Sequence, residues 1–257
     1  MQLLKDKIAI ITGGAGGIGL SASRIFAENG ATVVIFDVAK EAGEATEKEL
    51  CEKGYKAKFF YTDISNEENV IASVKAVEEL YGKVDVLYNN ASVFLGGGRD
   101  NVMDKLDTKF WDKILHINLY GLYHCTKHVI PLMKKAGGGS IINTSSSAGQ
   151  IGIPECDAYT ATKGATTSLT RSLAVEYGPY NIRTNCIAPA AIATDMVKES
   201  NLNDPNFDEQ KFLTQGTPLR RWGKPEEIAN VALFLASDLG TYLNGTVIVA
   251  DGGITVA

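Results

Sequence analysis

The 257-residue sequence has no long hydrophobic run and no excess of positive charge. No segment approaches the about 20 apolar residues of a membrane-spanning helix. The formal net charge is −5, and contacts with nucleic-acid phosphates need concentrated lysine and arginine. We therefore expect neither a membrane span nor a nucleic-acid partner.

Paired cysteines are also missing. No C-x-x-C spacing connects the four cysteines, which are Cys51, Cys125, Cys156 and Cys186. This distribution predicts neither a zinc site nor a disulfide framework. Reduced thiols fit a cytoplasmic protein, and the charged residues 1–7 lack the architecture of a signal peptide. His124 and His128 could ligate a metal from one helical face, but no third ligand joins them, so we expect no metal site.

Short apolar runs alternate with amphipathic segments along the whole chain, which is typical of βαβ units on a parallel sheet. Buried parallel strands read as continuous apolar runs. The runs lie at residues 8–11, 32–36, 58–61, 84–88, 140–143, 183–187 and 246–249. No composition break separates them. We predict one domain, 1–257, with an α/β Rossmann-type doubly wound sheet of about seven parallel strands and helices on both faces.

Helix starts between these strands are well marked. Ser65-Asn66-Glu67-Glu68 has the form of a capping box, in which the leading serine is the cap. Pro225-Glu226-Glu227 places proline and acids where a first helical turn favours them. Two long helices are expected at about 108–135 and 159–177.

A glycine-rich turn follows the first expected strand. It reads Thr12-Gly13-Gly14-Ala15-Gly16-Gly17-Ile18-Gly19, and residues 14–19 fit the spacing G-x-G-x-x-G. Glycines let the backbone bend sharply and approach a pyrophosphate, whose charge is met by the helix N-terminus. Asp37 ends the second expected strand, where an acid would accept hydrogen bonds from a ribose. The order of strand, turn and helix predicts a dinucleotide-binding site.

Tyr159 and Lys163 lie four residues apart, and Ser146 lies thirteen residues before the tyrosine. Four residues is just over one helical turn, so the phenol and the ammonium share a face. A phenol titrates near ~10 and is a poor base at neutral pH unless a cation favours its phenolate. Ser146 can hold a substrate oxygen while Tyr159 gives or takes its proton. Alone, the tyrosine and lysine would fit an ordinary amphipathic helix; the other motifs favour a catalytic pair.

Together these motifs resemble those of the short-chain dehydrogenase/reductase family over nearly the whole chain. Thr12-Gly13-x-x-x-Gly17-x-Gly19 matches the family's glycine-rich turn, and Asn89-Asn90-Ala91 matches its fourth-strand motif. Ser146, Tyr159 and Lys163 match its catalytic trio. The further matches are Asn118, Pro189 with Thr194, and Asp251-Gly252-Gly253.

The resemblance implies a role for each matched residue. Tyr159 would be the general acid/base, with Lys163 lowering its pKa and binding the nicotinamide ribose. Ser146 would orient the substrate oxygen, and Asn118 would hold a water that links Lys163 to solvent. The implied cofactor contacts are Gly13, Gly17, Ile18, Gly19, Asp37, Asp63, Ile64, Asn90, Ala91, Tyr159, Lys163, Pro189, Ile192 and Thr194. The resemblance also implies a homotetramer, with the two long helices at one interface.

Two positions depart from the family pattern. Ser92 and Ala190 stand where the family usually has glycine. Each adds a side chain near the nicotinamide end, and alanine reaches positive φ only at some cost. We expect a shifted pocket rather than a lost one. Residues 195–217 mix apolar and acidic side chains where the family carries a mobile lid; we interpret them as a lid, although a solvent-exposed helix pair would have a similar composition.

We predict an NAD-dependent oxidoreductase that transfers hydride between nicotinamide and a secondary alcohol or ketone. Sugar, hydroxysteroid and small-diol dehydrogenases stay open, because many substrates share this fold. One alternative is a 3-oxoacyl thioester reductase, for which Arg99 and Lys105 are candidate basic residues at the cleft mouth. Another is a cofactor-binding regulator without catalysis, which is disfavoured because the whole expected catalytic group is present.

Asp37 also predicts which dinucleotide binds. The 2′-phosphate of NADP would lie beside this carboxylate and be repelled. Gly14 and Val38, at the two usual places for a compensating cation, are uncharged. Lys40, three residues beyond Asp37, is the nearby base, and folding back toward Asp37 would weaken the repulsion. We therefore expect NAD.

Overall fold

A computed structural model describes residues 2–94, 100–197 and 207–257 of the chain. Its strands form one sheet in the order β3-β2-β1-β4-β5-β6-β7, with every neighbouring pair parallel. They are β1 (Ile8–Thr12), β2 (Thr32–Asp37), β3 (Lys56–Tyr61), β4 (Val86–Asn89), β5 (Gly139–Thr144), β6 (Ile182–Pro189) and β7 (Val247–Ala250). The prediction of about seven parallel strands is confirmed, and each predicted run overlaps its strand.

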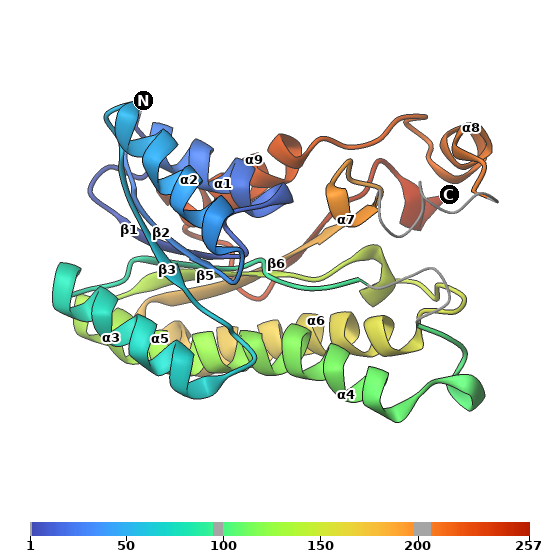
Figure 1. Ribbon diagram of the computed structural model, residues 1–257, viewed down its shortest axis with the longest axis horizontal. Helices are drawn as coiled ribbons and strands as arrows, with labels where there is room; N and C mark the ends of the chain where they lie inside the picture. The colour runs from blue at the N-terminus through green and yellow to red at the C-terminus, as the bar shows by residue number, and fades with distance from the viewer. Residues whose placement is uncertain (1, 95–99, 198–206) are drawn as a thin grey trace.

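Helices cover both faces of this sheet, so the doubly wound α/β prediction is confirmed (Figure 1). One face carries α1 (Gly17–Glu28), α2 (Lys40–Glu52) and α9 (Pro225–Ala236). The other carries α3 (Glu67–Tyr81), α4 (Thr108–Leu115), α5 (Gly121–Ala136) and α6 (Asp157–Tyr177). Among the described helices, none combines the length and apolar character that crossing a membrane requires.

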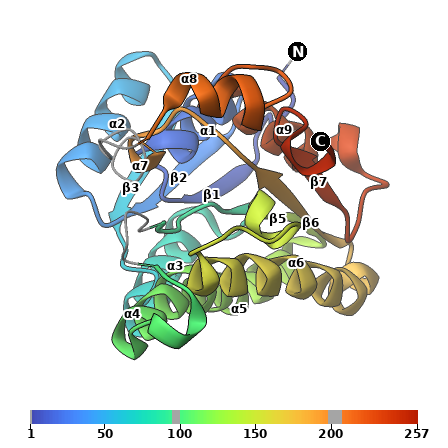
Figure 2. The same cartoon turned by 90° about the vertical axis from the view of Figure 1, so that its right-hand side faces the viewer.

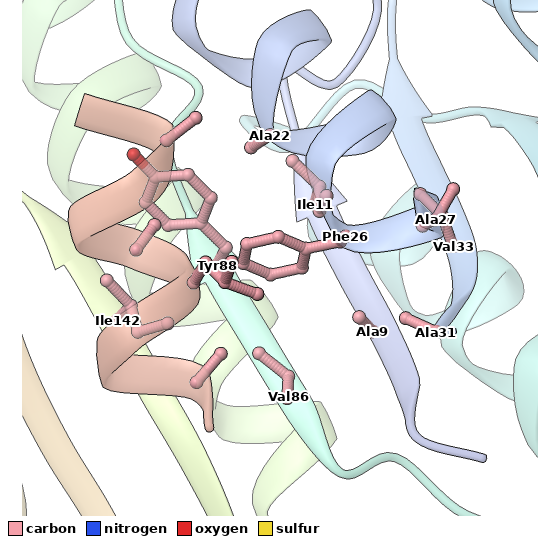
Figure 3. Packing of buried hydrophobic residues seen from close by; sticks show 14 of the residues in the cluster. Ala9, Ile11, Ala22, Phe26, Ala27, Ala31, Val33, Val86, Tyr88 and Ile142 are labelled. Atoms are coloured by element: carbon pink, nitrogen blue, oxygen red, sulfur yellow. The ribbon is translucent and has the colours of Figure 1, made fainter. Parts of the chain in front are cut away.

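Two clusters of buried apolar side chains hold the layers together. On β1, Ala9 and Ile11 belong to the cluster beneath α1 and α9, whereas Ile8 and Ile10 belong to the cluster on the opposite face. This alternation follows from the two-residue period of a strand. In the first cluster the ring of Phe26 stacks on Tyr88 with 6.4 Å between centroids (Figure 3). Burial of each such ring contributes about 1.5–3 kcal/mol and fixes α1 beside the glycine-rich turn.

The start of α3 differs from the sequence prediction. Asn66, rather than Ser65, is the N-cap, and its side-chain oxygen accepts a hydrogen bond from the N–H of Asn69 at 3.1 Å. The N–H and hydroxyl of Ser65 instead donate to Asp63 at 2.9 and 2.7 Å. Asparagine and serine cap equally well, so the preceding carboxylate decides between them. The predicted start of α9 at Pro225 is confirmed.

The long helix predicted at about 108–135 contains a break in its hydrogen-bonding pattern. A π-helical turn, His116–Tyr120, joins α4 to α5 and carries Asn118. Single π turns of this kind occur frequently at functional sites. The Asn118 amide accepts from the N–H of Val93 at 2.8 Å and donates to its carbonyl at 2.9 Å. The turn therefore anchors the segment that follows β4.

The predicted site residues converge at one edge of the sheet. The chain order reverses at β1, which lies between β2 and β4, and ligands of such sheets bind beyond the carboxyl ends of the strands at this reversal. The glycine-rich turn follows β1, Asp37 ends β2, and Asn90 follows β4. Ser146 follows β5 on the same edge. Figure 2 looks from this side, with α7 (Asp195–Val197) and α8 (Glu209–Lys211) above the sheet.

Candidate active site

A cavity of about 970 Å³ lies at this carboxyl edge. The predicted site residues line it, except Asn118 and Gly19. Asn118 is buried, with its amide bonded to Val93 in the cavity wall. Gly19 lies beneath the glycine-rich turn, where an added Cβ would collide with the carbonyl oxygen of Gly13. Gly19 therefore supports the turn through close packing.

The glycine-rich turn is shaped to receive a phosphate. Gly13 and Gly17 have φ of 65° and 50°, values that favour glycine. A Cβ on Gly13 would also lie 3.0 Å from the Cα of Ala91 on the neighbouring strand end. Helix α1 begins at Gly17, so the N–H groups of its first turn lack partners within the helix. Because Gly17 and Ile18 line the cavity, this end of it suits an anion.

Asp37 joins the end of β2 to this turn. Its carboxylate accepts hydrogen bonds from the N–H groups of Ala15 and Ala39, both at 3.0 Å, and it lines the cavity. The Lys40 ammonium lies 3.9 Å from a carboxylate oxygen of Glu44, one turn along α2. The nearest expected cation therefore has its own acidic neighbour.

Tyr159 and Lys163 line the opposite part of the cavity from consecutive turns of α6. The Lys163 side chain is buried, its Nζ donates to the carbonyl of Thr144 at 2.9 Å, and the same atom lies 5.4 Å from the centre of the Tyr159 ring. Burial lowers the pKa of Lys163 to about 8, because the ammonium loses hydration. The lysine is thus still mostly protonated at neutral pH.

Ser146 lies beside Tyr159 at the end of β5. Loss of hydration raises the pKa of Tyr159 to about 12, and a hydrogen bond with Ser146 opposes this rise. Burial, rather than Lys163, therefore sets the direction of the pKa shift of Tyr159, which is opposite to the one that the sequence led us to expect. The Ser146 hydroxyl also accepts from the N–H of Ala148 at 3.2 Å. The tyrosine is therefore a protonated phenol at neutral pH in this structure.

Comparisons with known proteins agree with this geometry. Residues 13–255 match the family profile described as enoyl-(acyl carrier protein) reductase. The 3-oxoacyl-[acyl-carrier-protein] reductase FabG of Chlamydia trachomatis is 41% identical over 98% of this chain and 98% of its own. Levodione reductase of Leifsonia aquatica is 37% identical over 98% of this chain and 95% of its own. The chain belongs to the short-chain dehydrogenase/reductase family.

Solved structures of this short-chain dehydrogenase/reductase fold superpose closely. A 7α-hydroxysteroid dehydrogenase complexed with NADH and 7-oxo glycochenodeoxycholic acid is 34% identical, with a TM-score of 0.90 over 100% of this chain and 97% of its own. A gluconate 5-dehydrogenase from Burkholderia cenocepacia in complex with NADP and tartrate is 31% identical, with a TM-score of 0.92. The match covers 100% of this chain and 98% of that protein's chain. The chain is thus an oxidoreductase of a family that binds nicotinamide dinucleotides. Of these two structural neighbours, one contains NADH and the other NADP.

The two departures from the family pattern both lie in the cavity wall. Ser92 and Ala190 line the cavity, which persists in their presence. Of these two neighbouring alanines, Ala191 has the positive φ, at 52°, whereas the sequence analysis expected it at Ala190. Because a Cβ costs free energy in this region, the strain lies one position further along the chain than expected.

Most of the apolar part of the wall was not predicted from the sequence, although Phe212 falls in the predicted lid. The ring of Phe94 meets that of Tyr159 edge-on, with 4.9 Å between centroids. Phe212 and Trp222 stack at 5.0 Å, and both line the cavity together with Ile153. They lie in segments that connect the strands and long helices, where the local pattern does not distinguish a residue of the cavity wall from a core residue. The fold alone brings them together.

Three other sequence interpretations are placed by the structure. His124 contacts the carbonyl of Ile64 at 2.9 Å and His128 contacts Glu67 at 2.9 Å; no group of three metal-ligating side chains occurs in the described ranges. Of the expected lid, α7 and Phe212 border the cavity, while residues 198–206 lie outside the described residues. Arg99 lies outside them as well.

Proposed function

We propose that this chain is an NAD-dependent oxidoreductase that transfers hydride between nicotinamide and a secondary alcohol or ketone. The observation that carries the proposal is one cavity with two unlike ends. An anion-binding turn and Asp37 form one end, and Ser146, Tyr159 and Lys163 form the other. Such a cavity holds a dinucleotide with its reactive ring beside a proton donor.

The residues present fit a nicotinamide dinucleotide. The volume of about 970 Å³ is at the upper end of the range of roughly 300–1,000 Å³ for ligand pockets. Gly17 and Ile18 would hold the pyrophosphate at the start of α1, and Asp37 the adenosine ribose. Lys163 would hold the nicotinamide ribose. When bound, the cofactor would supply or accept the hydride.

The protein would move the accompanying proton. In reduction, Ser146 would hold the substrate oxygen while Tyr159 donates its proton, and oxidation would reverse both roles. A phenol with a pKa of about 12 is fully protonated at neutral pH and suits a donor to a developing alkoxide. Lys163 would then favour the phenolate and return a proton to it. For Asn118 we propose the water-holding role implied by the family. Its side-chain amide already bonds to the backbone of Val93, so main-chain atoms of the π turn would hold the water.

Asp37 supports NAD over NADP. A 2′-phosphate about 5 Å from this carboxylate would be repelled by roughly 3 kcal/mol per charge at an effective dielectric near ~20, before screening. Since ~1.4 kcal/mol is tenfold in affinity, even a heavily discounted repulsion gives about a hundredfold preference for NAD. Val38 is uncharged, and the exposed Lys40, whose ammonium lies 3.9 Å from Glu44, would weaken the effect only by folding back toward Asp37.

The substrate end favours an apolar ketone or alcohol. Its described wall is built from apolar side chains such as Phe94, Ile153, Phe212 and Trp222. Lys163 is the one basic side chain of the cavity wall within the described ranges, and the proposed cofactor site uses it. Burial of hydrocarbon surface against an apolar wall contributes about 25 cal/mol of favourable binding free energy per Å². We therefore infer a hydrophobic, cyclic or branched substrate rather than an anionic one.

A 3-oxoacyl thioester reductase is the second candidate. The 41% identity to FabG favours it, and Lys105 lies exposed on the 3₁₀ helix η1 (Met103–Lys105) at the predicted cleft mouth. Consumption of NADH and of NADPH, measured over cyclic ketones, hydroxysteroids, sugar acids and a 3-oxoacyl thioester, separates the candidates. Binding of NADH with no turnover of any substrate would instead indicate a regulator.

We also propose a cytoplasmic homotetramer of single-domain subunits in which residues 195–217 act as a lid. Large apolar side chains stay uncovered on the long helices, at Tyr120, Tyr123 and Val175, and a second group, Leu239 and Tyr242, lies near β7. Separate uncovered groups suit the two-fold axes of a tetramer. Light scattering at micromolar concentration checks this assembly; a monomer would refute it.

A further inference from the structure

Asp100 carries a buried carboxylate that has no role in the chemistry proposed above. The residue is 2% exposed and lies between β4 and η1. A carboxylate leaves water at a large cost unless hydrogen bonds replace its hydration. Three backbone N–H groups supply them. Asn101 and Ala158 donate to Oδ1 at 2.9 and 3.1 Å, and Tyr159 donates to Oδ2 at 2.9 Å.

These contacts complete the N-terminus of α6. Its N-cap residue is Cys156, whose side chain makes no capping hydrogen bond. Cysteine is not among the residues that cap well, so the first N–H groups of the helix need an acceptor from elsewhere. Asp100 provides it from 58 residues earlier in the chain. The positive end of the helix macrodipole in turn stabilises the buried carboxylate.

The cap acts directly on the residue that carries the proposed chemistry. Tyr159 is the third residue of α6, and its own N–H is held by Asp100. Phe94, which also follows β4, packs on the Tyr159 ring. Asp100 and Phe94 therefore hold the backbone and the ring of one residue, Tyr159. We propose that Asp100 is a positioning residue, which sets the place of Tyr159 by capping α6 from a distant part of the chain; the proposal rests on the proposed role of Tyr159.

Asp100→Asn tests the proposal with little change in size. The amide keeps one acceptor oxygen but turns an NH₂ group toward helix N–H groups. A shift of about 1 Å in a reacting group costs up to ~100-fold in rate, so we expect kcat to fall about 10- to 100-fold while the Kd of NADH changes less than about twofold. If Asp100→Asn does not fold, the same two quantities, kcat and the Kd of NADH, are measured for Asp100→Ser, which places a neutral hydroxyl at this position.

The matched control is Asp107→Ala, because alanine removes a cap that asparagine would keep. Asp107 caps α4 by accepting from the N–H of Phe110 at 3.0 Å, and α4 carries none of the proposed catalytic group. Loss of a cap lowers the melting temperature by about 2–4 °C in a chain of this size, so both variants should lose stability alike. Only the Asp100 variants should lose kcat. An equal kcat in Asp100→Asn and Asp107→Ala would overturn the proposal.

A double-mutant cycle separates positioning from general loosening. Once Tyr159→Phe has removed the proton donor, Asp100→Asn should lower the residual rate less than about twofold, because residues acting as a unit are not additive. If the rate losses of the two single variants multiply in the double variant, Asp100 acts on a group other than Tyr159. Full activity of Tyr159→Phe itself would instead refute the proposed function, so the two failures are distinguishable.

Discussion

The two ends of the cavity are built in different ways. The proposed cofactor end contains backbone and short polar side chains at the ends of adjacent strands, such as Gly13 and Asp37. The proposed substrate end contains apolar side chains from distant connecting segments, such as Phe94 and Trp222. The first kind of site depends on local backbone geometry and is shared by a family. The second depends on which side chains happen to face inward, and it is where members of the family differ.

Tyr159→Phe should give the largest effect, because it removes chemistry where the two ends meet. General acid/base catalysis contributes about 10²- to 10⁴-fold, so we expect turnover to fall by that factor. The ring still packs on Phe94, and the Kd of NADH, measured by fluorescence titration, should be nearly unchanged. Retention of a third of the wild-type turnover would contradict the assignment.

A change confined to the cofactor end should alter cofactor choice alone. Asp37→Ala combined with Val38→Arg removes the repulsion and adds a cation beside the 2′-phosphate. We expect the ratio of kcat/KM with NAD to that with NADP to fall at least about 100-fold, with the order of preferred substrates unchanged. Comparable efficiency of the wild-type protein with NADP would show that Asp37 does not lie at the ribose.

Trp222→Ala is the corresponding change at the substrate end. The variant opens the apolar wall beside Phe212, and one hydrophobic group in a pocket discriminates by about 10- to 200-fold. We expect kcat/KM for a hydrophobic ketone to fall about tenfold or more, and the Kd of NADH to stay constant. Equal losses for hydrophobic and polar substrates would mean that this wall does not select the substrate.

Burial of Lys163 predicts a smaller, pH-dependent effect on stability. Its pKa is lowered from 10.5 to about 8 in the folded chain, so between these values the unfolded chain binds more protons and stability rises with pH. Below pH 8 the cost of the buried charge is complete, and it disappears as pH rises toward 10.5. Relative to Lys163→Met, the wild-type protein should gain about 1–3 kcal/mol over this range, measured by urea unfolding. A constant difference would indicate an ordinary lysine pKa.

The same contrast explains what the sequence could predict. The strands and the glycine-rich turn are local patterns, because period, turn chemistry and spacing are written within a few neighbouring residues. The order of strand ends along one edge then brings Asp37, Ser146 and Tyr159 to one cavity. The sequence alone therefore predicts these elements and positions.

The parts that were missed depend on contacts between distant segments. Ser65 does not cap α3, because its hydroxyl donates to Asp63. The positive φ lies at Ala191 rather than at Ala190. The role of Asp100 at α6 joins residues 58 positions apart. Likewise, the high pKa of Tyr159 reflects burial that spacing alone does not show. No local pattern encodes such effects.

Transfer of label tests the central claim most directly. Wild-type protein is supplied with NADH carrying deuterium on the transferred position of nicotinamide C4 and with a hydrophobic cyclic ketone, and the product is analysed by mass spectrometry. The account predicts an alcohol with one deuterium on the carbinol carbon, formed at least about 100-fold more efficiently than with the equally labelled NADPH. An unlabelled alcohol, or no alcohol from any ketone despite bound NADH, would contradict hydride transfer by this protein.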